Sequence, residues 1–265
     1  AMKRSHLLLS LFLAVTLPTI HASQVRVWGE ALSGFDPTVI NNFYNGVAGT
    51  TSQIIGGTLD SNNLTGVNLL WATQPADDYT AAELTSMANL LSAGGRIAFM
   101  GEHGTFAPAQ NVRINAALLA LGSTISIQTN TIHDPGYRDA TVGDGQILNH
   151  PLTAGVNTYT YAAYAPLNVA GTAQILMIGE DQPSIMMAYQ NIGPGSIFLI
   201  TDQNVWDFGV VANTFGNDNH QMFENLLLGN TGAPPPPNGQ VPEPSTLLLT
   251  ACGGALVLIG RRLKR

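Results

Sequence analysis

The chain has 265 residues, with ten Lys and Arg against 17 Asp and Glu, a formal net charge of −7 and one cysteine. Six of the ten basic residues lie at the two ends, so residues 23–232 carry four arginines, no lysine and a net charge of −12. Binding of nucleic acid needs clustered Lys and Arg, so we exclude nucleic acid as a partner. The one cysteine, Cys252, lies near the C-terminus, which excludes disulfides and thiol chemistry from residues 23–232.

The N-terminus has the three parts of a secretory signal peptide. Lys3 and Arg4 form a basic start, Leu7–Leu17 is apolar, and Ile20-His21-Ala22 ends in a small residue. We therefore expect residues 1–22 to be a signal peptide that is cleaved after Ala22.

Residues 23–232 alternate short apolar runs with helical patterns. We expect strands at Val25–Trp28, Val67–Trp71, Arg96–Met100, Ile125–Gln128, Gln174–Ile178, Ile185–Gln190 and Ser196–Thr201. We expect helices from Asp36, as N-cap, with Pro37 in the first turn, and at Tyr79–Leu91, Asn111–Leu121 and His220–Leu228. Within the second of these helices Thr80 and Glu83 have capping-box spacing. His133–Asp139 is a polar stretch that we interpret as a turn in a long loop.

This element order predicts an α/β domain. Early alternation of strands and helices favours a parallel sheet covered on both faces. Gly193-Pro194-Gly195 predicts a late hairpin, added antiparallel at one edge. We therefore expect one three-layer, flavodoxin-like domain at 23–232, with a mostly parallel sheet, followed by a Pro-rich linker at 233–240.

The domain resembles the class I glutamine amidotransferase-like α/β domain. The resemblance is carried by Val67–Trp71, Thr80–Leu91, Gly94–Glu102, Asn149–Val156, and Gly195–Asp202 with Asn219–Leu228 after it. That family places a catalytic Cys in a Gly-x-Cys-x-Gly turn, but this chain reads Gly101-Glu102-His103-Gly104-Thr105. The His-x-Glu pair of the family is replaced by Asp202-Gln203-Asn204. Glutamine hydrolysis needs an activated thiolate, so the sequence excludes that reaction.

Four residues are the candidates for a ligand or metal site. Glu102 and His103 follow one expected strand and Asp202 follows another, at the sheet edge where open α/β sheets bind ligands. With His220 they could form a carboxylate and imidazole cluster that holds a divalent metal. The alternative is structural: Glu102 and His103 brace their turn, and Asp202 caps a loop. We expect no other cofactor. Tyr159, Tyr161 and Tyr164 either stack on sugars or pack in the protein, and packing is the commoner role.

The C-terminus resembles the PEP-CTERM sorting signal. Val241, Pro242, Glu243 and Pro244, followed by Ser245, form the motif. An apolar segment, Thr246–Gly260, follows the motif, and a basic tail of Arg261, Arg262, Lys264 and Arg265 ends the chain. The basic tail would be held on the cytoplasmic side of the membrane. The resemblance implies transient anchoring in the inner membrane and cleavage by an exosortase-type membrane protease. The alternative is a permanent single-span anchor.

The expected function follows from the predicted export signals at the two ends of the chain and from the absence of cysteine in residues 23–232. We expect an exported extracellular or cell-surface protein of a Gram-negative bacterium, acting as a non-catalytic binding or matrix component. The sorting resemblance implies an association with exopolysaccharide or biofilm. The alternative is a metal- or carboxylate-dependent hydrolase that acts on glycan through Glu102, His103 and Asp202.

Overall fold

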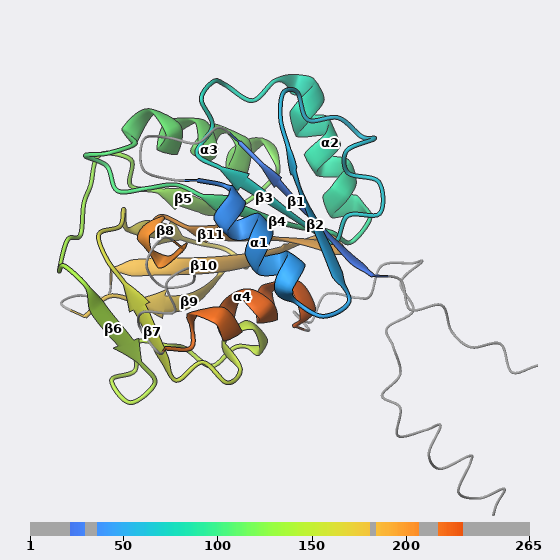
Figure 1. Cartoon of the computed structure of the whole chain (residues 1–265). Coiled ribbons are helices and arrows are strands. Elements are labelled where there is room, and N and C mark those ends of the chain that lie inside the picture. The colour runs from blue at the N-terminus through green and yellow to red at the C-terminus, as the bar shows by residue number, and fades with distance from the viewer. Residues whose placement is uncertain (1–21, 30–35, 181–183, 207–216, 230–265) are drawn as a thin grey trace, which may run out of the picture.

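The computed structural model describes residues 22–29, 36–180, 184–206 and 217–229 (Figure 1). The predicted Pro-rich linker and sorting tail, and all but the last residue of the predicted signal peptide, lie outside these ranges. None of the helices in the described ranges is both long enough and apolar enough to cross a membrane.

A nine-stranded mixed sheet forms the centre of the described structure. In spatial order its strands are β2 (Thr50–Ile55), β1 (Ser23–Trp28), β3 (Leu69–Thr73), β4 (Arg96–Met100), β11 (Gly195–Ile200), β10 (Ile185–Ile192), β8 (Leu167–Val169) and β5 (Ile125–Ile127), and β9 (Gln174–Ile178) also pairs with β10. The neighbours from β2 to β11 are parallel, whereas β10 is antiparallel to β11, β8 and β9, and β5 is antiparallel to β8. A separate two-stranded antiparallel sheet consists of β6 (Arg138–Thr141) and β7 (Thr158–Tyr161).

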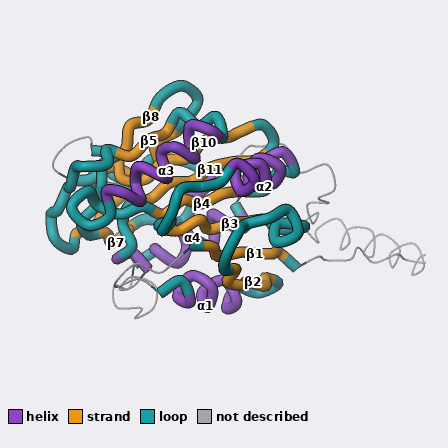
Figure 2. Tube along the Cα trace, turned by 90° about the horizontal axis from the view of Figure 1, so that it is seen from above, coloured by secondary structure: helices purple, strands orange, loops and turns teal. Residues whose placement is uncertain are grey.

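Helices cover both faces of the sheet and give the three layers that the sequence predicts. They are α1 (Thr38–Gly46), α2 (Ala81–Ser92), α3 (Pro108–Ala120) and α4 (Asn219–Leu228), with a short 3-10 turn, η1 (Pro151–Thr153). Figures 1 and 2 show α1 and α4 on one face and α2 and α3 on the other. The predicted three-layer α/β class with a mostly parallel first half and late antiparallel strands is thus confirmed.

The alternation of side chains along β3 shows how the sequence builds two cores. Leu69 and Trp71 point to the core shared with α1 and α4, whereas Leu70 and Ala72 point to the core shared with α2 and α3. All five residues of β3 are buried, as expected for a parallel strand with helices on both faces. Burial on both faces of the sheet is the reason why this part of the sequence is continuously apolar.

The predicted capping box of α2 is present. The Thr80 hydroxyl accepts a hydrogen bond from the Glu83 backbone N–H at 3.2 Å, and the Glu83 carboxyl accepts one from the Thr80 N–H at 2.8 Å. Asp36 acts in a similar way at α1, where its Oδ1 accepts the Thr38 N–H at 2.9 Å. Pro37, however, is the N-cap residue of that helix, one position later than predicted.

Two features of the sheet differ from the prediction. The strands β2, β6, β7 and β8 were not predicted, because they are short or polar and lack a clear apolar period. The late hairpin, β10–β11, does not lie at an edge: β11 is an interior strand between β4 and β10. The strand predicted at Ile125–Gln128 occupies that edge instead, as β5, paired antiparallel with β8.

The three tyrosines considered for sugar stacking belong to the core. Tyr159, Tyr161 and Tyr164 are at most 1% exposed, and the last two rings contact each other with centroids 5.9 Å apart. Packing is therefore their role in this fold.

Candidate functional site

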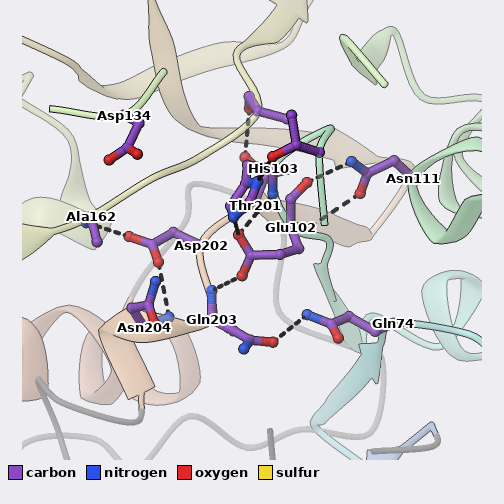
Figure 3. A network of polar contacts seen from close by, with 12 residues as sticks. Gln74, Glu102, His103, Asn111, Asp134, Ala162, Thr201, Asp202, Gln203 and Asn204 are labelled. Carbon is purple, nitrogen blue, oxygen red and sulfur yellow. Dashed lines mark hydrogen bonds and ion pairs between the residues drawn. The ribbon is translucent and has the colours of Figure 1, made fainter. Parts of the chain in front are cut away.

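Polar side chains follow three neighbouring parallel strands at their carboxyl ends. Gln74 follows β3, Glu102 follows β4, and Asp202 and Gln203 follow β11. All four residues are buried, with exposed fractions of 7% or less. Figure 3 shows them as one polar network, at the edge of the sheet where the sequence predicts a site.

Glu102 is the centre of this network. One carboxyl oxygen, Oε1, accepts the His103 backbone N–H at 2.7 Å, and the other, Oε2, accepts the Gln203 N–H at 3.0 Å. The second bond joins the turn after β4 to the turn after β11. The Glu102 side chain therefore holds two segments that lie about a hundred residues apart in the sequence.

The backbone of Glu102 is clamped by α3. Its N–H donates to Asn111 Oδ1 at 3.1 Å, and Asn111 Nδ2 donates to the Glu102 carbonyl oxygen. Asn111 is fully buried. A Cβ atom at Gly101 would lie 2.5 Å from the same Asn111 Oδ1, which explains the glycine before Glu102. The turn is thus built by close approach of the backbone to Asn111.

His103 projects from the same turn and stays partly exposed. Its Nδ1 lies 2.9 Å from Thr105 Oγ1, and its Nε2 lies 3.8 Å from Glu102 Oε1. Partial burial lowers the pKa of His103, and the nearby Asp134 carboxylate opposes this shift. The sequence predicts the pairing of Glu102 with His103, and the structure brings the two side chains together.

Asp202 is fully buried and holds a third segment. Its Oδ2 accepts the Ala162 N–H at 2.7 Å, and its Oδ1 accepts the Asn204 N–H at 2.8 Å. Burial raises the pKa of Asp202 to about 7, although the hydrogen bonds from Ala162 and Asn204 act in the opposite direction. The side chain therefore links the end of β11 to the end of β7.

The raised pKa of Asp202 predicts a pH dependence of stability. Between pH 3.8, the ordinary value, and about 7, the folded protein keeps a proton on Asp202 that the unfolded chain has lost. The contribution of Asp202 to the unfolding free energy should therefore fall as the pH rises through this window. Asp202→Asn should flatten that fall. Urea unfolding of both proteins at pH 5 and pH 7 measures the slope, and equal slopes would contradict the assignment.

His220 does not join the other three candidates. It lies on α4, and its ring stacks on the Phe43 ring of α1 with centroids 5.8 Å apart and an interplanar angle of 8°. No group of three or more His, Cys, Asp or Glu side chains within the described ranges is placed to hold a metal ion. The four-residue metal cluster considered from the sequence is therefore not formed, because α4 directs His220 to α1.

Gln74 and Asn111 belong to the network but were not predicted. Gln74 Nε2 donates to Gln203 Oε1 at 2.8 Å, while its own Oε1 is buried without a partner among the described residues. The sequence does contain a signal for Gln74, because Gln74 is the first polar residue without a hydroxyl group after the buried strand β3. Asn111 gave no signal, because its role depends on how α3 packs against the turn.

The arrangement is suited to holding the backbone in place. The carboxyl groups of Glu102 and Asp202 each accept two hydrogen bonds from backbone N–H groups. Both residues are at most 1% exposed. A general acid or base needs to reach a proton on a substrate, and these geometries direct the oxygens to the protein itself. These contacts therefore favour the structural alternative, in which Glu102 braces its turn.

Solved structures with a similar fold are known. The N-terminal domain of mmIFT52 superposes with a TM-score of 0.60 and 17% identity, over 77% of this chain and 95% of that one. A cytoplasmic protein from Salmonella typhimurium LT2 gives a TM-score of 0.56 and 11% identity, over 77% and 98%. A protein assigned to GMP synthase from Thermoplasma acidophilum gives 0.49 and 13%, over 78% and 93%.

These similarities concern the fold. The described domain shares its fold with the mmIFT52 N-terminal domain and with the Salmonella protein. No protein-family model matches the sequence, and no curated protein is significantly similar to it.

Proposed function

We propose that this chain is an exported protein whose α/β domain acts outside the cell as a non-catalytic binding or matrix component. The support for export is the sequence itself: a signal-peptide pattern at residues 1–22 and a sorting-signal pattern at Val241–Arg265. On this proposal, an exosortase-type protease is a transient partner in the inner membrane, and exopolysaccharide or biofilm is the destination.

The position of Glu102 is the single observation that supports a non-catalytic role. Its turn is the one in which the amidotransferase-like pattern places a nucleophile, at the position of His103 in this chain, and both Glu102 carboxyl oxygens accept backbone N–H bonds. A carboxyl group that acts on a substrate has to reach it, whereas Glu102 is 1% exposed. The turn is used as a structural brace, and the fold remains available as a scaffold for binding.

A sorting experiment tests the proposal. We expect the intact chain, expressed in a Gram-negative host with an exosortase, to reach the cell surface or medium. A variant with Pro242→Ala, Glu243→Ala and Pro244→Ala should remain in the inner membrane, because the motif is changed while the apolar segment and basic tail are kept. Cell fractionation followed by immunoblotting measures the distribution.

A matched control changes prolines outside the motif. Pro235→Ala with Pro236→Ala alters the neighbouring linker and should leave the distribution as in the unaltered chain. If the motif variant and the unaltered chain fractionate alike, the sorting proposal is wrong.

A further inference from the structure

We propose that a surface pocket beside the β6–β7 sheet binds a neutral glycan. The pocket has a volume of about 340 Å³ and is lined by Tyr137, Arg138, Asp139 and Thr160. Its size lies in the lower part of the usual range for ligand pockets, about 300–1,000 Å³, which suits a short stretch of sugar rings. The inference rests on the proposed function, because it gives the binding domain a site and a class of ligand.

Asp139 supplies a fixed hydrogen-bond acceptor. It is the register partner of Thr160 across the two strands, so the two side chains lie on the same face. Asp139 Oδ1 accepts bonds from Thr160 Oγ1 at 2.6 Å and from Asn217 Nδ2 at 3.0 Å. Its other oxygen, Oδ2, accepts no hydrogen bond from the residues that the structure describes. An oriented carboxylate oxygen is thus left to accept a hydroxyl proton.

Arg138 lines the same pocket and supplies fixed donors. Its Nε donates to Glu180 Oε1 at 2.8 Å, and its Nη1 donates to the Tyr137 carbonyl oxygen at 3.0 Å. Its Nη2 makes no hydrogen bond within the described part of the chain. Groups that are already held in place lose less conformational entropy when a ligand binds. Donor and acceptor groups that line one pocket can each bond a different hydroxyl of a glycan.

Tyr137 supplies an exposed aromatic ring. It is 48% exposed, although it is one of the larger apolar side chains of the domain. Tyrosine is common in binding sites, because its rigid ring has an apolar face and a polar end. A sugar ring likewise has an apolar C–H face and a polar rim. Small-molecule sites usually combine aromatic side chains with a few polar groups that are held in position.

Charge selects a neutral glycan over an acidic one. The Arg138 guanidinium is paired with the Glu180 carboxylate, and Asp139 adds a negative charge to the pocket lining. Residues 23–232 carry a net charge of −12. A uronic acid polymer would be repelled by this field, whereas an uncharged polymer would not.

Calorimetric titration of the full chain tests the site. The probes are cellohexaose, mannohexaose and an alginate hexamer, and the protein is kept in a detergent without a sugar headgroup. We expect at least one neutral hexamer to bind and the alginate hexamer to bind more weakly. Tyr137→Ala should raise the dissociation constant about tenfold, and Tyr137→Phe should keep it within about threefold, because the ring carries the contact. Phe106→Ala removes a ring that is 43% exposed elsewhere and should have no effect.

The outcomes separate this inference from the proposed function. If a neutral hexamer binds and Tyr137→Ala, still folded by its near-ultraviolet circular dichroism, binds it equally well, the site is wrong and the function stands. If the alginate hexamer binds better than both neutral hexamers, or neither neutral hexamer binds, the neutral-glycan inference is overturned. The sorting experiment then decides the proposed function by itself.

Discussion

Glu102→Ala should lower the unfolding free energy by about 2–5 kcal/mol. The substitution leaves the Gln203 N–H, in a residue that is 7% exposed, without its acceptor, and it also removes the acceptor of the His103 N–H. A buried donor that loses its partner costs about 1–3 kcal/mol. The turns after β4 and β11 would then be joined mainly by the backbone bond from Gly101 N–H to Ile200 O at 2.9 Å. Urea unfolding monitored by tryptophan fluorescence measures the loss.

A surface carboxylate provides the control for this experiment. Asp78 is 93% exposed at its side chain and pairs with Arg113 at 3.3 Å. Exposed pairs of this kind contribute about 1 kcal/mol at most, so Asp78→Ala should change stability little. A Glu102→Ala protein as stable as Asp78→Ala would show that Glu102 is not a brace.

Trp71→Ala should lower the unfolding free energy by about 3–5 kcal/mol. Trp71 is fully buried in β3, and its ring contacts Trp206 and Phe223 with centroids 5.3 Å and 5.8 Å away. Its Nε1 donates to Tyr44 Oη at 3.2 Å. The alanine variant would lose this packing, which joins the sheet to α1 and α4, and would leave a cavity. The midpoint of urea unfolding should shift accordingly.

Trp28 is the matched tryptophan for this comparison. It lies at the end of β1, is only partly buried, and donates from Nε1 to the Gly57 carbonyl oxygen at 2.7 Å. Trp28→Ala should cost less than Trp71→Ala, since less apolar area returns to water. An equal or larger loss at Trp28 would contradict the core assignment.

The sequence predicts the parts of the fold that depend on local pattern. The apolar run at Val67–Trp71 predicts a buried strand, although the strand observed is shifted to Leu69–Thr73. The Thr80 and Glu83 spacing predicts the start of α2, because a capping box is made within four residues. The position of β5 at the antiparallel edge was not predicted, because strand order depends on contacts between distant segments.

The candidate site divides in the same way. Sequence reasoning places Glu102 and Asp202 at the carboxyl ends of strands, which follows from the α/β pattern. It does not predict the partners that decide their role. The N–H groups of Gln203 and Ala162 reach these carboxyls only because β11 and β7 end nearby, and no local pattern encodes that approach. His220 was grouped with them by residue type, but the packing of α4 directs it to Phe43.

The intact mass of the protein recovered from the cell surface or medium tests the central claim of export and sorting most directly. The full chain has a mass of 28.0 kDa. The proposal predicts a smaller species that lacks residues 1–22 and ends near the Val241–Pro244 motif, without the apolar segment and the basic tail. A recovered protein that still carries Arg261–Arg265 would contradict processing by an exosortase-type protease and would favour the permanent anchor.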